Sequence, residues 1–152
     1  MPKIVVLDEP TIGLDPQGKY LVWQKLTELK SQGITQLLCT QNMEEANVLC
    51  DRVAIMNQGK ILSLDFPEAL ISRYVGDEVW EVRVSGEERD NLMKGLRKQG
   101  RDFEEVGGNV NIFHVDKEEE LIGLLNNQRK FKRRSATLED VFLRLTGRSL
   151  LE

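Results

Sequence analysis

Long apolar runs are missing from this sequence of 152 residues. No stretch of about 18 consecutive apolar residues occurs, so no segment predicts a transmembrane helix. The N-terminus lacks the basic and apolar regions of a secretory signal peptide. Hydrophobic residues make up 40% of the chain and charged residues 30%, which is typical of a globular protein with a packed core. Together these features predict a cytoplasmic protein.

Cysteine and histidine, the commonest soft metal ligands, are scarce. Cys39 and Cys50 stand apart in apolar surroundings without a CxxC pair, which favours buried thiols over a metal site or a disulfide. His114 is the single histidine and falls in a predicted strand, between Phe113 and Val115. It has no acidic or cysteine partner at ligand spacing, so a structural role is favoured over metal binding.

A strong charge of either sign is also missing, since the net charge is −4. This mild value gives no electrostatic reason to expect a nucleic-acid partner. One basic run, RKFKRR at 129–134, could contact phosphates or anionic lipid headgroups. A solvated edge strand protected by lysine and arginine is the favoured interpretation.

The most informative stretch is KIVVLDEPTIGLD, from Lys3 to Asp15. Its apolar run at 4–7 predicts a strand buried on both faces of a parallel sheet, and such sheets bind ligands beyond the carboxyl ends of their strands. Two carboxylates stand at that end. In phosphoryl transfer one carboxylate holds Mg²⁺ and a second activates the attacking water, so Asp8 is the predicted metal ligand and Glu9 the predicted general base.

The run VVLDEPT followed by GLD resembles the Walker B motif and D-loop of the ATP-binding subunits of ATP-binding-cassette (ABC) transporters. The resemblance implies ATP and Mg²⁺ as cofactors, and it implies that the D-loop residue Asp15 contacts the nucleotide site or the partner cassette. The same residue, followed by Pro16, also predicts the cap of a helix that ends near Gly33. Capping alone and capping with a second role both stay open. The predicted buried stripe of this helix is Leu21, Val22, Trp23, Leu26 and Leu29.

A second strand at 34–40 leads to Gln41 and to a helix that Asn42 and Glu45 start with capping-box spacing. This segment resembles the switch region of the same family, THxMEEAExLCDRV, except that Gln41 occupies the position of the histidine. The resemblance implies that Gln41 contacts the γ-phosphate and takes part in catalysis. An amide cannot carry the charge of a histidine, which predicts less efficient hydrolysis than in the family. The other interpretation is a polar strand end without a catalytic role.

The predicted fold class is α/β: the C-terminal part of a P-loop NTPase (ABC cassette) fold at 1–76, followed by a small α+β ferredoxin-like domain at 77–152. The first part ends in a hairpin around 57–60 and a short helix from Pro67 to Tyr74. The second part predicts a strand at 78–85, a helix at 87–99, a hairpin at 103–106 and 110–115, a helix at 117–127 and a basic strand at 129–134. Ser135 or Thr137 then caps a helix that ends at Gly147.

The ending SATLEDVFLRLTGR is similar to the tails of cassette subunits from daunorubicin-resistance and sodium-export systems. The glycine-rich loop GxxxxGK[ST] and the LSGGQ-like signature of the family do not occur in the sequence, so we expect a C-terminal fragment. The predicted function is ATP hydrolysis coupled to efflux, with a second cassette and a membrane permease as partners on the cytoplasmic face of the membrane. We expect this chain alone to be inactive. The alternative is a non-catalytic interaction or dimerisation module.

Overall fold

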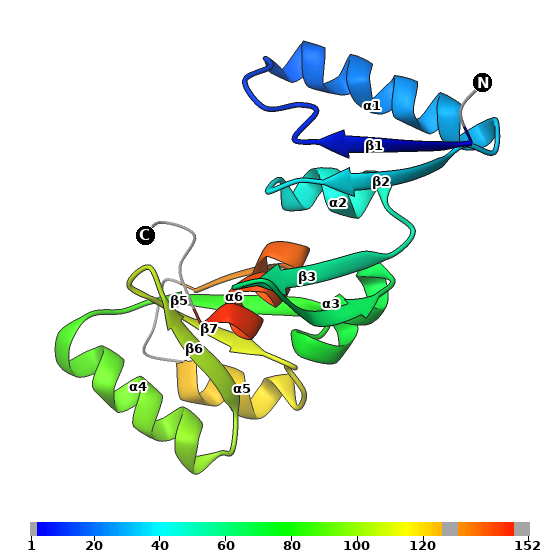
Figure 1. Cartoon of the computed structure of the whole chain (residues 1–152). Coiled ribbons are helices and arrows are strands. Elements are labelled where there is room, and N and C mark those ends of the chain that lie inside the picture. The colour runs from blue at the N-terminus through cyan, green and yellow to red at the C-terminus, as the bar shows by residue number, and fades with distance from the viewer. Residues whose placement is uncertain (1–2, 126–130, 148–152) are drawn as a thin grey trace. The chain divides into compact units, whose positions relative to one another are not determined.

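A computed structural model describes residues 3–125 and 131–147 and divides the chain into two compact units, residues 1–67 and 68–152 (Figure 1). The class is α/β, as predicted. The sequence places a boundary near Val75 to Asp77, after helix α3 (Pro67–Tyr74), whereas the structure groups this helix with the second unit. The physical reason is burial: Leu70 and Val75 have no exposed surface, and the Val75 carbonyl accepts a hydrogen bond from His114 N at 2.8 Å.

The first unit contains a parallel pair of strands, β1 (Ile4–Asp8) and β2 (Thr35–Cys39), in the register Asp8 opposite Cys39. Helix α1 (Pro16–Ser31) connects them and helix α2 (Met43–Leu49) follows β2. An antiparallel hairpin of β3 (Val53–Asn57) and β4 (Lys60–Asp65) completes the unit. The order strand, helix, parallel strand is the crossover that parallel pairing requires.

Exposure alternates along β1 and β2, which corrects the prediction of strands buried on both faces. The side chains of Ile4, Val6 and Leu37 are 63%, 68% and 59% exposed. Cys39 lies on the same open face as Leu37 and is exposed, and Cys50 is half-buried, so the prediction of buried thiols was wrong for Cys39. The reason is that, in the described part of the chain, packing covers only one face of this pair.

The second unit is a four-stranded antiparallel sheet in the order β6-β7-β5-β8. Its elements are β5 (Glu78–Arg83), α4 (Gly86–Lys98), β6 (Asp102–Val106), β7 (Asn109–Phe113), α5 (Glu118–Leu125) and β8 (Phe131–Ser135). This order of elements and strands is the predicted ferredoxin-like arrangement. Residues 126–127 of the predicted second helix and 129–130 of the predicted basic strand lie outside the described residues.

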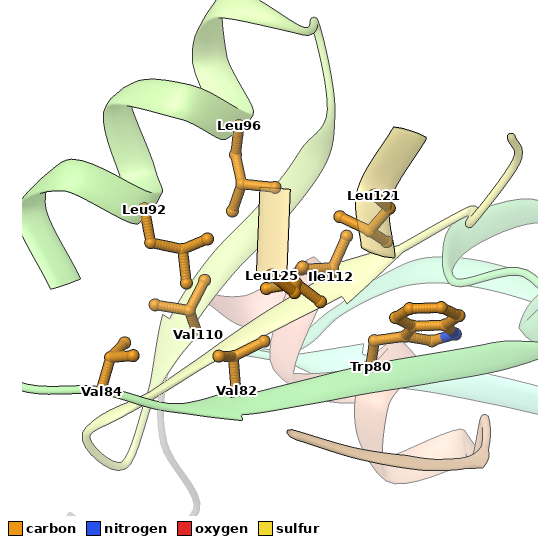
Figure 2. Close-up of a cluster of buried hydrophobic side chains, with 9 residues drawn as sticks. All are labelled: Trp80, Val82, Val84, Leu92, Leu96, Val110, Ile112, Leu121 and Leu125. Atoms are coloured by element: carbon orange, nitrogen blue, oxygen red, sulfur yellow. The ribbon is translucent and has the colours of Figure 1, made fainter. Parts of the chain in front are cut away.

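Helices α4 and α5 cover one face of this sheet. Figure 2 shows their leucines directed toward β5 and β7; the buried cluster is Trp80, Val82, Val84, Leu92, Leu96, Val110, Ile112, Leu121 and Leu125. Phe131 of β8 stacks on the Trp80 ring at a centroid distance of 5.3 Å. Because burial of apolar surface is the main stabilising term in folding, this cluster is the core of the second unit.

Helix α6 (Leu138–Thr146) packs against the other face of the same sheet, the face that α4 and α5 do not cover. Arg134 of β8 donates to both Asp140 oxygens at 2.7 Å, and Arg144 lies over the Phe113 ring at 4.3 Å. Of the two caps left open by the sequence, Thr137 is the one used, in a capping box with Asp140. The helix ends at Gly147, whose φ of 61° is the left-handed conformation that suits glycine.

The basic strand is an edge strand, as favoured from the sequence, since β8 pairs only with β5 in the described sheet. Its arginines pair with acids: Arg133 contacts Glu78 at 2.8 Å and Glu118 at 3.0 Å. The hydrogen bond from Arg133 lowers the pKa of the Glu78 carboxyl. Pairing of this kind leaves less of the basic charge available to phosphate or lipid.

Candidate functional site

The predicted acids stand together at the carboxyl end of β1, in the first unit. Asp8 is the last residue of the strand and is exposed, and Glu9 is half-buried. In residues 3–125 and 131–147, neither carboxylate has a hydrogen bond or ion pair. Free carboxylate oxygens are the ligands that Mg²⁺ prefers, and Mg²⁺ is usually held by one or two carboxylates together with water and phosphate oxygens. The residues present therefore fit such an ion.

Glu9 has a backbone conformation that is uncommon for this residue type. Its φ is 46°, in the left-handed region, while its N–H still donates to the Cys39 carbonyl at 2.8 Å. This last hydrogen bond between β1 and β2 holds the peptide that joins Asp8 to Glu9, and the chain leaves the sheet immediately after Glu9. Non-glycine residues in this region cost conformational energy and are enriched at functional sites. The strand therefore ends between the two acids: Asp8 belongs to β1 and Glu9 begins the turn that follows.

The turn after Glu9 leads directly to the helix cap predicted from the sequence. Ile12 N donates to the Glu9 carbonyl and Leu14 N to the Thr11 carbonyl, each at 3.2 Å. Asp15 Oδ1 then accepts from Gly18 N at 2.7 Å and caps α1. Capping by Asp15 is confirmed, and its role at a nucleotide or partner cassette stays a prediction.

Gln41 is exposed and lies between the end of β2 and the start of α2. Because Asp8 and Cys39 are paired residues of parallel strands, Gln41 falls at the same edge of the sheet as Asp8 and Glu9. Asn42 Oδ1 accepts from Glu44 N at 3.0 Å and from Glu45 N at 3.2 Å, which confirms its capping role. The structure thus brings the candidate catalytic residues to one edge.

The capping box predicted for Asn42 and Glu45 is only half present. Asn42 N donates to Thr40 Oγ1 at 3.0 Å instead of to Glu45. The Glu45 side chain is fully buried and accepts from Thr11 Oγ1 at 2.8 Å and from Trp23 Nε1 at 2.9 Å. Sequence reasoning missed this network, because the capping-box spacing assigned the Glu45 side chain to Asn42 N, while its two actual donors lie 22 and 34 positions away.

Helix α1 buries a narrower stripe than the sequence predicts. Trp23 and Leu26 are buried, Val22 and Leu29 are half-buried, and Leu21 is 62% exposed, so its assignment to the stripe was wrong. The two helices also meet at the surface, where Lys19 Nζ contacts Glu44 Oε2 at 2.9 Å. That hydrogen bond raises the pKa of Lys19.

His114 follows β7 instead of lying within a strand, and its φ is 44°. Its Nε2 atom is 3.8 Å from Asp102 Oδ2, a partner that sequence spacing did not reveal. No group of three or more histidine, cysteine or acidic side chains able to hold a metal occurs among residues 3–125 and 131–147. In the same ranges, no helix is both long and apolar enough to cross a membrane.

The homologues of this chain are ATP-binding proteins of ABC transporters, and the similarity extends over nearly all of its length. In particular, the chain is 38% identical over 151 residues to the Nod factor export ATP-binding protein I of Burkholderia lata, with 98% of this chain and 49% of the relative covered. The Mesorhizobium japonicum protein of the same name is 36% identical over 152 residues, covering 99% and 44%.

The chain spans about half the length of the curated relatives it matches. Among solved structures, cbiO1 from Clostridium perfringens, part of the ABC transporter complex cbiONQ, aligns with a TM-score of 0.43 and 33% identity. That alignment covers 47% of this chain and 29% of the other. No protein-family model matches the chain.

Proposed function

We propose that this chain is part of the ATP-binding subunit of an efflux-type ABC transporter, to which it contributes the Walker B strand, the D-loop and the switch region. The observation that carries the proposal is the pair of unpartnered carboxylates, Asp8 and Glu9, at the sheet edge that also holds Gln41. Similarity to ATP-binding export proteins over 98% of the chain supports it.

In the proposed reaction, each residue at this edge has one task. Asp8 holds Mg²⁺, directly or through water, and bound Mg²⁺ would neutralise charge on the phosphate that is transferred. Glu9 accepts a proton from the attacking water. Gln41 donates an amide hydrogen bond to a γ-phosphate oxygen. Asp15 caps α1 and, in the D-loop, contributes to the nucleotide site at the contact with a second cassette.

The proposed partners are a second ATP-binding cassette and a membrane-spanning permease, on the cytoplasmic face of the cell membrane. The tail sequence resembles that of daunorubicin-resistance and sodium-export subunits, and the relatives are named for Nod factor export. Both observations support export as the direction of transport.

The test is single-turnover ATP hydrolysis by a composite protein, in which the upstream part of the Burkholderia lata relative is joined to this chain. Gln41→His should raise the rate about tenfold, because one well-placed donor to transition-state charge is worth on the order of a hundredfold and glutamine replaces it incompletely. Nucleotide affinity should change little. Glu9→Gln should abolish turnover while ATP stays bound.

The matched control is Gln24→His, the same change on the exposed side of α1. It should leave the rate unchanged. Equal rates for the parent and Gln41→His would show that Gln41 has no catalytic role. Turnover that survives Glu9→Gln would show that Glu9 is not the general base. Both results together would favour the alternative, a non-catalytic interaction module.

A further inference from the structure

Glu45 of α2 is an acidic side chain with no exposed surface. Its Oε1 atom accepts two hydrogen bonds, from Thr11 Oγ1 at 2.8 Å and from Trp23 Nε1 at 2.9 Å. Its Oε2 atom is also buried and has no hydrogen-bond partner in the described ranges. A carboxylate loses its hydration when it is buried, so the two bonds to Oε1 must compensate for a large cost. Such a group is an unexpected choice for a position that only needs to fill space.

The three residues of this network come from three different segments. Thr11 lies in the turn that begins at Glu9, Trp23 lies on α1, and Glu45 lies on the helix that begins just after Gln41. A single carboxylate therefore links the acidic turn to the helix that follows the switch residue. The hydrogen bonds leave little freedom, since the Thr11 hydroxyl and the Trp23 indole both converge on one oxygen.

We propose that Glu45 is a positioning residue, which holds the turn of residues 9–14 against α1 and α2 and so fixes Glu9 relative to Gln41. The proposal rests on the proposed function, because the position of Glu9 relative to Gln41 matters only if both residues act in ATP hydrolysis. Glu45 does not touch the reacting atoms. It acts through Thr11, two residues after the proposed base, and through its own helix, whose cap is the residue next to Gln41.

The neighbouring acid offers a matched control. Glu44 also connects α2 to α1, through its 2.9 Å contact with Lys19, but it is largely exposed and does not reach the turn. If the network merely joined the two helices, removing either acid would have similar consequences. If Glu45 holds the turn, only its removal should loosen the turn.

The experiment measures amide hydrogen exchange by NMR in the ¹⁵N-labelled chain. The reporters are Ile12 and Leu14, whose N–H groups close the turn, compared with the amides of the β1–β2 ladder. Glu45→Ala should speed exchange in the turn about tenfold relative to the ladder. Glu44→Ala should change this ratio less than about twofold.

The amide variant separates geometry from charge. Glu45→Gln keeps a carbonyl oxygen for Thr11 and Trp23 and places its NH₂ group at the unpartnered Oε2 position, so the exchange ratio should stay within about twofold of the parent. If Glu45→Ala unfolds the first unit, Thr11→Val removes one donor at nearly constant volume and should still loosen the turn selectively. Equal acceleration of turn and ladder by Thr11→Val or by a folded Glu45→Ala variant, or equal loosening by Glu44→Ala or by Glu45→Gln, would overturn the proposal.

A second measurement distinguishes this inference from the proposed function. Mn²⁺ alone, added as a paramagnetic probe, should selectively broaden the amide signals of Asp8 and Glu9 in the parent chain. In Glu45→Ala the broadening of the Ile12 and Leu14 amides, relative to that of Asp8, should change at least about twofold, because the turn is no longer held in place beside the ion. Unchanged broadening beside a loosened turn would overturn the positioning role. No selective broadening in the parent would count against Asp8 as the metal ligand, while the exchange ratio would still decide whether Glu45 holds the turn.

Discussion

Replacing Asp140 should destabilise the second unit, because this residue connects the last helix to the sheet. Its side chain is 5% exposed and forms two 2.7 Å hydrogen bonds with the Arg134 guanidinium. It also accepts from Thr137 N at 2.9 Å and completes the capping box. Arg134 contacts Glu81 of β5 as well. Glu81, Arg134 and Asp140 therefore form one network between β5, β8 and α6.

The expected magnitude follows from the bonds that each variant loses. Charge-assisted hydrogen bonds contribute roughly 1.5–3 kcal/mol each and an N-cap about 1 kcal/mol. Since Arg134 keeps its pairing with Glu81, the cost of leaving it without Asp140 is reduced. We expect Asp140→Ala to lower the free energy of unfolding of the second unit by about 3 kcal/mol. Asp140→Asn keeps an oxygen for Thr137 and should cost about 1.5 kcal/mol.

The assay is urea unfolding followed by NMR, in which the Trp80 indole signal reports on the second unit and the Trp23 signal on the first. Glu139→Ala is the matched control, since Glu139 is exposed on the same turn of α6. It should shift stability by less than about 0.5 kcal/mol. A loss below about 0.5 kcal/mol for Asp140→Ala would refute the reasoning, because the network would then contribute no more than an ordinary surface pair.

The same network predicts a pH dependence. Burial by itself would raise the pKa of the Asp140 carboxyl, but hydrogen bonds from Arg134 and from Thr137 outweigh burial and lower the pKa below its ordinary value. A lowered folded pKa stabilises the protein above the unfolded value, near 3.9, and this stabilisation is lost as the pH falls through the folded pKa. The stability difference between the parent and Asp140→Asn should therefore shrink as the pH falls below about 5. A constant difference would contradict this assignment.

Two further predictions concern the chain as a whole. In limited proteolysis followed by mass spectrometry, residues 68–147 should resist cleavage longer than residues 3–67. The reason is that the first unit exposes Ile4, Val6 and Leu37, whereas the second has a buried core. Survival of the first unit with loss of the second would disprove this. Calorimetry should detect no saturable Mg-ATP binding below the millimolar range, because the phosphate-binding sequence GxxxxGK[ST] does not occur in this chain. A micromolar dissociation constant would instead reveal a phosphate site of another kind.

Much of the fold was predictable from the sequence because its signals are local. The Asp15–Pro16 pair and Gly147 mark the ends of two helices through backbone conformations that few other residues favour. Strands, helices and turns between 78 and 125 follow apolar periods of two and 3.6, and their order predicts the ferredoxin-like sheet. The acidic edge was predictable for the same reason: parallel strands end at one side, so Asp8 and Gln41 had to lie at that side.

Other features depend on which faces of the strands and helices are covered by packing, and the period of apolar residues does not specify which faces those are. It places Leu37 and Cys39 on one face of β2, but only packing leaves that face exposed. The two partners of Glu45 lie 22 and 34 positions away in the sequence. The Glu81 partner of Arg134 lies 53 positions away, and the Asp102 partner of His114 lies 12 positions away. No local pattern therefore encodes these pairs.

The sequence by itself therefore determined the order of elements, the caps at Asp15 and Asn42 and the edge at which the acids meet, because each of these depends on a few neighbouring residues. Only the tertiary structure decided that Glu45 is buried beneath the acidic turn, that Asp140 joins α6 to the sheet, and that one face of the β1–β2 pair is exposed. These outcomes require segments distant in the chain to pack together, and the free energy of a buried charge depends on the partners which that packing supplies.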